Sequence, residues 1–153
     1  MIGRLYTVGI GAEAQTAAKT LIEVASAADS VTLLERAYIS QSSFDTSENL
    51  AARIQRVTTT GTGTSFTPRP VQAGDAAFGG SVETNSTIEP TYTSSTELVE
   101  QGFNVLSGWL WTPANDDEVI CLSPSALVGI ALDVAPSASM NFHYGCTLRE
   151  IGG

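Results

Sequence analysis

Residues 140–149, with the sequence MNFHYGCTLR, carry the clearest structural signal in the chain. An apolar side chain recurs at every second position, and polar residues such as Asn141 and His143 lie between them. Successive side chains of a strand point to opposite faces of the sheet, so this spacing places one apolar row on one face. The stretch predicts a β-strand whose inward row consists of Met140, Phe142, Tyr144, Cys146 and Leu148.

The segment before it repeats the pattern. In residues 127–134, LVGIALDV, the apolar row consists of Val128, Ile130, Leu132 and Val134. Residues 135–139, APSAS, separate the two segments and are typical of a turn. The sequence therefore predicts that 127–134 and 140–149 form an antiparallel pair.

The first half of the chain is harder to interpret. In residues 30–40, SVTLLERAYIS, one predicted row consists of Val31, Leu33, Ala37 and Ile39, with Leu34 and Tyr38 on the other face. Residues 49–57, NLAARIQRV, fit both a strand, through Leu50, Ala52 and Ile54, and a helix face, through Leu50, Ile54 and Val57. Helix propensity slightly favours the helix, but we interpret the segment as a strand because its neighbours are strands.

Nine segments of the chain fit the pattern of short strands. They are residues 4–10, 19–25, 30–40, 49–57, 81–87, 98–111, 118–122, 127–134 and 140–151. Connections rich in Gly, Pro, Ser and Thr separate them, as in β-sandwiches and jelly rolls. We therefore expect residues 1–153 to form one all-β domain, a jelly-roll-like β-sandwich with about eight or nine short antiparallel strands.

The composition disfavours several classes of partner. The 153 residues include 16 Asp and Glu against 7 Lys and Arg, for a formal net charge of −9. Nucleic acids and anionic membrane surfaces both attract clustered basic side chains, so we expect neither as a direct partner. A basic protein surface suits this charge better. The longest apolar run, residues 126–132, is too short to span a membrane and no targeting signal is recognisable, so we expect a soluble protein.

No residue pattern predicts catalysis, a cofactor or a metal site. The glycines of residues 58–70, TTTGTGTSFTPRP, lack the lysine and the spacing of a phosphate-binding loop. The single histidine, His143, lies on the outward row of its predicted strand, and residues 115–118, NDDE, fit a solvated turn. Cys121 and Cys146 have no metal-binding spacing, so we expect two reduced, buried thiols, with a disulfide between them as the alternative. The chain is therefore interpreted as a protein that is not an enzyme.

The long connection at residues 60–80 is the candidate interaction segment. It holds two prolines and five glycines, and structureless connections of this length are uncommon in compact domains unless they serve a function. Two interpretations stay open: the connection folds back over its own sandwich, or it contacts another subunit. The candidate protein-interface residues are Phe66, Pro68, Arg69, Pro70 and Phe78.

The two tryptophans allow two interpretations. Trp109 and Trp111 share a predicted face with Phe103 and Val105, which favours a place in the core. Exposed tryptophans would instead stack on sugars or anchor an interface.

Four stretches together resemble a known protein family. They are TLIEVASAADSVTLLERAYISQSS (20–43), TGTGTSFTPRPVQAGDAAFGG (60–80), EQGFNVLSGWLWTP (100–113) and IALDVAPSAS (130–139). They resemble the small all-β proteins that tailed bacteriophages encode among their head genes, which are capsid decoration or cement proteins. The likeness spans most of the chain and rests on the order of segments and on loop phrases.

This resemblance implies a structural role in the virion. The expected protein is a jelly-roll subunit that forms a homotrimer, binds the major capsid protein on the outer surface of the phage head and stabilises the shell. Its synthesis would take place in the host cytoplasm. The alternative that the residues leave open is a receptor- or carbohydrate-binding module of a virion fibre or tail tip.

Overall fold

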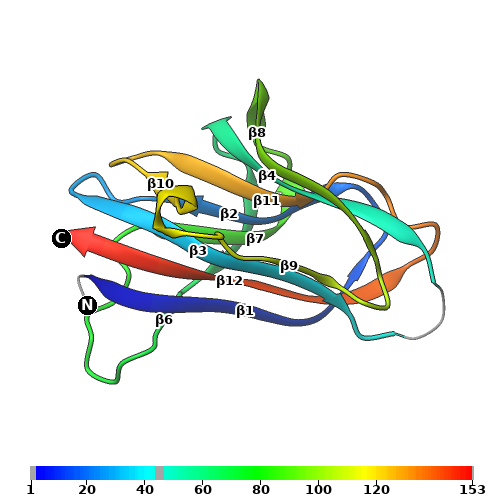
Figure 1. Ribbon diagram of the computed structural model, residues 1–153, viewed down its shortest axis with the longest axis horizontal. Coiled ribbons are helices and arrows are strands. Elements are labelled where there is room, and N and C mark those ends of the chain that lie inside the picture. The colour runs from blue at the N-terminus through cyan, green and yellow to red at the C-terminus, as the bar shows by residue number, and fades with distance from the viewer. Residues whose placement is uncertain (1–2, 44–46, 153) are drawn as a thin grey trace.

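The computed structural model describes residues 3–43 and 47–152, which form two antiparallel six-stranded sheets packed face to face (Figure 1). Sheet A contains β1 (Arg4–Gln15), β3 (Ser30–Gln41), β6 (Arg69–Pro70), β9 (Trp109–Trp111), β10 (Ile120–Leu122) and β12 (Met140–Gly152). Sheet B contains β2 (Lys19–Ala25), β4 (Asn49–Thr59), β5 (Thr62–Phe66), β7 (Ser81–Ile88), β8 (Thr91–Asn104) and β11 (Leu127–Leu132). Within the described residues the only helix is the short 3-10 turn η1 (Asp116–Glu118).

The strand pairing has the nested order of a jelly roll. β1 pairs with β12, β2 with β11, β3 with both β9 and β10, and β4 with β8. The chain is therefore folded back on itself so that early strands lie beside late ones, alternately in one sheet and in the other. The prediction of an all-β, jelly-roll-like sandwich is confirmed.

The strand count differs from the prediction. Twelve strands lie within the described part of the chain, against the eight or nine expected. β5 and β6 lie in the connection that was interpreted as a loop, and residues 98–111 divide between β8 of sheet B and β9 of sheet A. Residues 60–70 consist mainly of Thr, Gly and Pro, so they carry no apolar row that would mark a strand.

The predicted pairing of residues 127–134 with 140–149 is wrong. β11 lies between β2 and β4 in sheet B, whereas β12 lies between β1 and β3 in sheet A. The connection at 133–139 therefore crosses from one sheet to the other. A period-two row shows which face of a strand is buried, but both sheets bury their faces in the same core, so it does not identify the partner strand.

The alternating row of β12 is confirmed as the centre of the core. The side chains from Met140 to Leu148 in this row are between 0% and 2% exposed. On β4, Leu50, Ala52 and Ile54 are also buried, as the strand interpretation of this segment requires.

The predicted row of β3 is wrong at its N-terminal end. The buried side chains of β3 include Thr32, Leu34, Ala37 and Ile39. Leu34 pairs with Leu148 and Arg36 with Thr147, so Glu35 is an extra residue in the ladder. This β-bulge changes which alternate positions face the core, and Val31 and Leu33 therefore lie on the outer face, half-buried.

A glycine in the centre of sheet A makes room for an aromatic side chain. A Cβ at Gly145 of β12 would lie 2.3 Å from the Val8 carbonyl oxygen and 2.6 Å from the Tyr38 hydroxyl. The Arg36 guanidinium carbon lies 5.7 Å from the centre of the Tyr38 ring. Tyr38 therefore packs against the outer face of sheet A, where any larger residue at position 145 would displace it.

We expect Gly145→Ala to lower the free energy of unfolding by about 1–3 kcal/mol, because the added methyl group forces the Val8 backbone or Tyr38 to move. Gly11→Ala is the matched control, since a Cβ at Gly11 would meet no atom within 4 Å. Urea unfolding of both variants measures the difference. Equal stability of the two variants would contradict the expectation.

Candidate functional site

The long connection closes one lateral side of the sandwich. β5 pairs with β7, which extends sheet B beyond β2, and β6 pairs with β1 at the edge of sheet A. The connection therefore runs from sheet B to sheet A and back again along the side formed by β1 and β2. The structure has the connection folded over its own sandwich, which is the first of the two interpretations, and contact with another subunit stays a prediction.

A buried carboxylate holds the end of this connection in place. Glu150, which is only 3% exposed, accepts hydrogen bonds from the Gly79 amide at 2.9 Å and from the Ser30 hydroxyl at 3.2 Å. The Tyr6 hydroxyl lies 2.9 Å from the Ala76 carbonyl oxygen and 3.3 Å from the same carboxylate. The connection is therefore attached to β1 through Tyr6 and to β12 through Glu150, and Ser30 of β3 supports the Glu150 carboxylate.

The predicted interface residues divide into two groups. Phe78 is 8% exposed and packs edge to face on Tyr6, with ring centres 5.3 Å apart. Pro68 is buried, and Phe66 is half-buried against the core. These three apolar side chains therefore stabilise the fold itself. Arg69 is exposed and Pro70 is half-buried on β6, and their role in an interface stays a prediction.

The opposite lateral side carries a groove. It has a volume of about 530 Å³ and lies between the edge of sheet B at β8 and the edge of sheet A at β10. Its lining includes Leu98 and Val99 of β8, Trp111 of β9, residues 118–121, and Arg56 of β4. Arg56 donates from Nη1 to the Cys121 carbonyl oxygen at 3.0 Å and so bridges the two sheets.

The two tryptophans have different surroundings. Trp109 is 3% exposed and belongs to the core, as expected. Trp111 is half-buried and lines the groove, so its prediction as a core residue holds only in part. Because the groove joins segments from four strands and a turn, the spacing of residues along the sequence does not reveal it.

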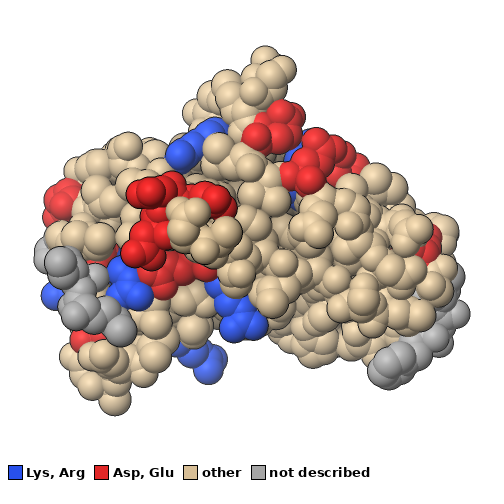
Figure 2. Space-filling view, in the orientation of Figure 1, with Lys and Arg blue, Asp and Glu red and all other residues tan. Residues whose placement is uncertain are grey.

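Acidic side chains gather beside the groove. Figure 2 shows them over the region that η1 and β10 occupy in Figure 1. In this turn the Asn115 side chain accepts from the Asp117 amide at 2.9 Å, and Glu118 accepts from the Ala114 amide at 3.3 Å. Residues 3–43 and 47–152 contain no group of three His, Cys, Asp or Glu side chains placed to hold a metal ion.

The histidine and the two cysteines of the chain do not form a common site. His143 is half-buried on the outer face of β12. Cys146 is buried, and its burial raises the pKa of the thiol. Cys121 is exposed, so the prediction that both thiols are buried is wrong for this residue. Its neighbours Ile120 and Leu122 face the core, and the alternation of the strand therefore turns Cys121 outward.

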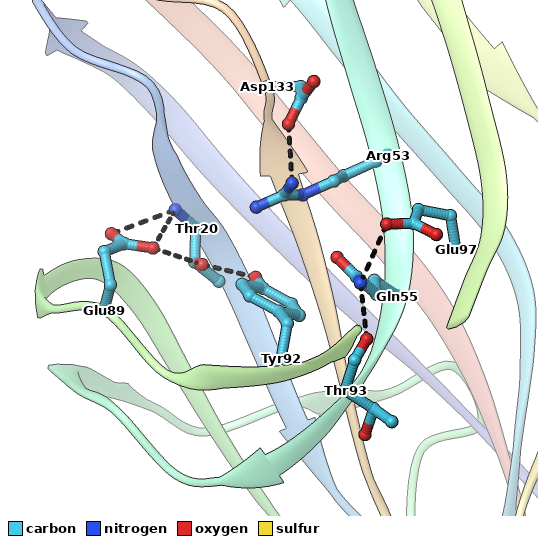
Figure 3. Close-up of polar contacts among 8 residues, drawn as sticks. All are labelled: Thr20, Arg53, Gln55, Glu89, Tyr92, Thr93, Glu97 and Asp133. Carbon is cyan, nitrogen blue, oxygen red and sulfur yellow. Dashed lines mark hydrogen bonds and ion pairs between the residues drawn. The ribbon is translucent and has the colours of Figure 1, made fainter. Parts of the chain in front are cut away.

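A polar network attaches the start of β8 to the outer face of sheet B (Figure 3). A Cβ at Gly129 of β11 would lie 2.4 Å from the Tyr92 hydroxyl, so Tyr92 packs directly on this glycine. The Arg53 guanidinium carbon lies 4.7 Å from the Tyr92 ring centre, and Arg53 also pairs with Asp133 at 2.6 Å. Gln55 donates to the Thr93 carbonyl oxygen at 2.8 Å.

The same network affects the ionisation of Tyr92. Burial raises its pKa to about 12, while its hydrogen bond with Thr20 and the nearby Arg53 charge act in the opposite direction. The neutral phenol is therefore the form that the folded state favours.

No protein-family model matches the sequence, and comparisons with curated proteins and with solved structures also find no significant match. Within residues 3–43 and 47–152, no helix has the length and apolar character required to cross a membrane. The strand order of its two sheets defines the class of the chain, which is a jelly-roll β-sandwich.

We expect Glu150→Ala to lower the free energy of unfolding by about 1–3 kcal/mol, because the buried Ser30 hydroxyl and the part-buried Gly79 amide lose a shared acceptor. Glu100→Ala, an exposed glutamate on β8, is the control and is expected to stay within about 0.5 kcal/mol of the wild type. Urea unfolding and hydrogen exchange at Gly79 provide the measurements. If the amide of Gly79 exchanged hydrogen at the same rate in Glu150→Ala as in the wild type, the hydrogen bond between Gly79 and Glu150 would not stabilise the connection.

Alkaline pH is expected to weaken the fold in part through Tyr92. Its pKa is raised from 10.0 to about 12 in the folded state, so its contribution to stability is complete below pH 10 and is lost as pH rises through about 12. Tyr92→Phe should therefore show a shallower loss of stability across this window than the wild type. Denaturant unfolding at a series of pH values tests this, and parallel curves would refute it.

Proposed function

We propose that this chain is a structural protein of a tailed-phage head, a decoration protein that binds the outer surface of the shell as a trimer bridging capsomers. The observation that carries the proposal is the closed lateral side of the sandwich. β5, β6 and β7 extend both sheets there, and Glu150 clamps their connection. A connection that joins both sheets on this side suits a protein that reinforces a shell. The resemblance of the sequence to decoration proteins supports the same role.

The energetics follow from mass action. Packaged DNA pushes the shell outward, and a subunit bound across two capsomers must dissociate before they separate. The binding free energy of each copy therefore adds to the strength of the lattice. Three identical subunits in one trimer engage three neighbouring sites, so weak individual contacts suffice.

The acidic charge is used in two ways. Three glutamates accept hydrogen bonds from amides of the long connection: Glu23 from Gly61 at 3.0 Å, Glu83 from Gly63 at 2.7 Å and Glu150 from Gly79 at 2.9 Å. Other carboxylates, including those of η1, remain exposed. Their charge favours docking on basic patches of the major capsid protein and opposes contact with free DNA.

A receptor- or carbohydrate-binding module is the second candidate function. The specific observation in its favour is Trp111, an aromatic side chain that lines the groove beside Arg56 and Glu118. Trp109 cannot take part, since it is buried in the core.

Phage heads purified without this chain and then incubated with it test the proposal. We expect the chain to co-sediment with the heads, to dissociate progressively as ionic strength rises, and to protect them against DNA loss on heating or osmotic shock. At equal occupancy, Glu150→Ala should protect less than the control Glu100→Ala.

Two outcomes contradict the proposal. One is heads that bind none of the chain or lose DNA equally with and without it. The other is a glycan-array signal that disappears in Trp111→Ala, which would favour the carbohydrate-binding module instead.

A further inference from the structure

The two lateral sides of the sandwich differ in shape. In sheet A, β10 lies at one end of the strand order and β6 at the other, and in sheet B, β8 and β5 are the corresponding ends. The side of β8 and β10 carries the groove, which is concave. The side of β6 carries the loop 71–77, which extends from the body at the lower left of Figure 1.

The loop 71–77 is attached to β1 by a hydrogen bond at each end and contains one internal hydrogen bond. The Val71 amide donates to the Leu5 carbonyl oxygen at 2.8 Å, and the Ala76 carbonyl oxygen lies 2.9 Å from the Tyr6 hydroxyl. Between them, the Asp75 amide donates to the Gln72 carbonyl oxygen at 3.2 Å, and Gly74 has a φ of +97°, in the region that favours glycine. A loop whose shape is fixed in advance loses little conformational entropy on docking.

The loop and the groove each expose an aliphatic side chain. Val71 is 54% exposed, although it is an aliphatic residue at the base of a protrusion. In the groove, Leu98 is 41% exposed and lies with Trp111 and Ile120 in the lining. Both surfaces would lose contact with water if the loop occupied the groove.

The charges of the two sides are also complementary. Arg56 and the exposed Glu118 both line the groove, and the exposed Asp116 and Asp117 precede Glu118 in η1. The loop carries the half-buried Asp75, and the exposed Arg69 lies at its base on β6. Docking can therefore place Asp75 near Arg56 and Arg69 near η1, which favours one orientation of the loop.

We propose that the loop 71–77 of one copy of this chain docks into the β8–β10 groove of the next copy. The contact joins different surfaces of the two copies, so it is a head-to-tail interface that closes into a ring when the rotation between copies completes a circle. Docking also covers the edges of β8 and β10. Uncovered edge strands present unpaired backbone groups, which favour aggregation. This inference takes from the proposed function only the number of copies in the ring, which is three.

Cross-linking through a native cysteine tests the contact. Cys121 is an exposed thiol in the groove, and Cys146 is buried. We expect Val71→Cys treated with a short bis-maleimide to give covalent dimers and larger species up to the closed ring, and Cys121→Ser in the same background to abolish them. Val134→Cys, at a 45% exposed position outside both surfaces, is the matched control and should not cross-link to Cys121.

A charge exchange gives a second, independent measurement. Light scattering of the wild type should report one discrete oligomer, and Arg56→Glu or Asp75→Arg alone should shift it toward monomer at least tenfold in the dissociation constant. The double variant Arg56→Glu/Asp75→Arg should restore the oligomer, which loss of folding in either single variant cannot imitate.

The outcomes separate this inference from the proposed function. A wild type that is monomeric at all concentrations, or an oligomer that cross-links through Val134→Cys and not through Val71→Cys, overturns the contact. Monomers that still bind and protect phage heads would overturn the contact and the trimer, and would leave only the decoration role of the proposed function. A ring that binds no heads would support the contact and contradict the proposed function.

Discussion

The pairing of β1 with β12 is the constraint on which the rest of the structure depends. Arg4 lies opposite Glu150 and Gln15 opposite Met140, so the two ends of the described chain are joined along the middle of sheet A. Strands between them then pair in nested order, and the apolar row of β12 is covered by sheet B. Once these strands are paired, β5, β6 and β7, which lie between β4 and β8 in the sequence, extend the two sheets on the side of β1 and β2. The groove remains on the other side.

The sequence predicts the strands of this fold better than their partners. Alternation is strong in β12 and β4, where one face is buried and the other is not, and these strands were predicted correctly. It fails at Glu35, because a bulge adds one residue and reverses which positions face inward. It also cannot assign β11 and β12 to different sheets, since both bury their apolar rows in a common core. The partner of a strand depends on contacts across the whole chain.

The candidate site was less predictable than the fold. The length of residues 60–80 indicated a functional segment, but Phe66, Pro68 and Phe78 turn out to pack on the chain's own core. Burial depends on what lies opposite a side chain, which in the case of Phe78 is Tyr6, far away in the sequence. The groove combines Arg56, Leu98, Trp111 and residues 118–121, and no local pattern links these positions. The one hint was Trp111, for which the sequence left open a place in the core or in an interface, and which lines the groove.

The adjacency of Arg4 and Glu150 also has a kinetic consequence. Contacts between residues so distant along the chain require a large loop to close before any stabilising interaction forms, and proteins rich in such contacts fold slowly. During that delay the partly folded chain leaves the edges of its central strands open to other copies. A circular permutant that joined the two ends covalently would turn the most distant pairing into a hairpin, so the order in which the sheets assemble would change while the final architecture stayed the same.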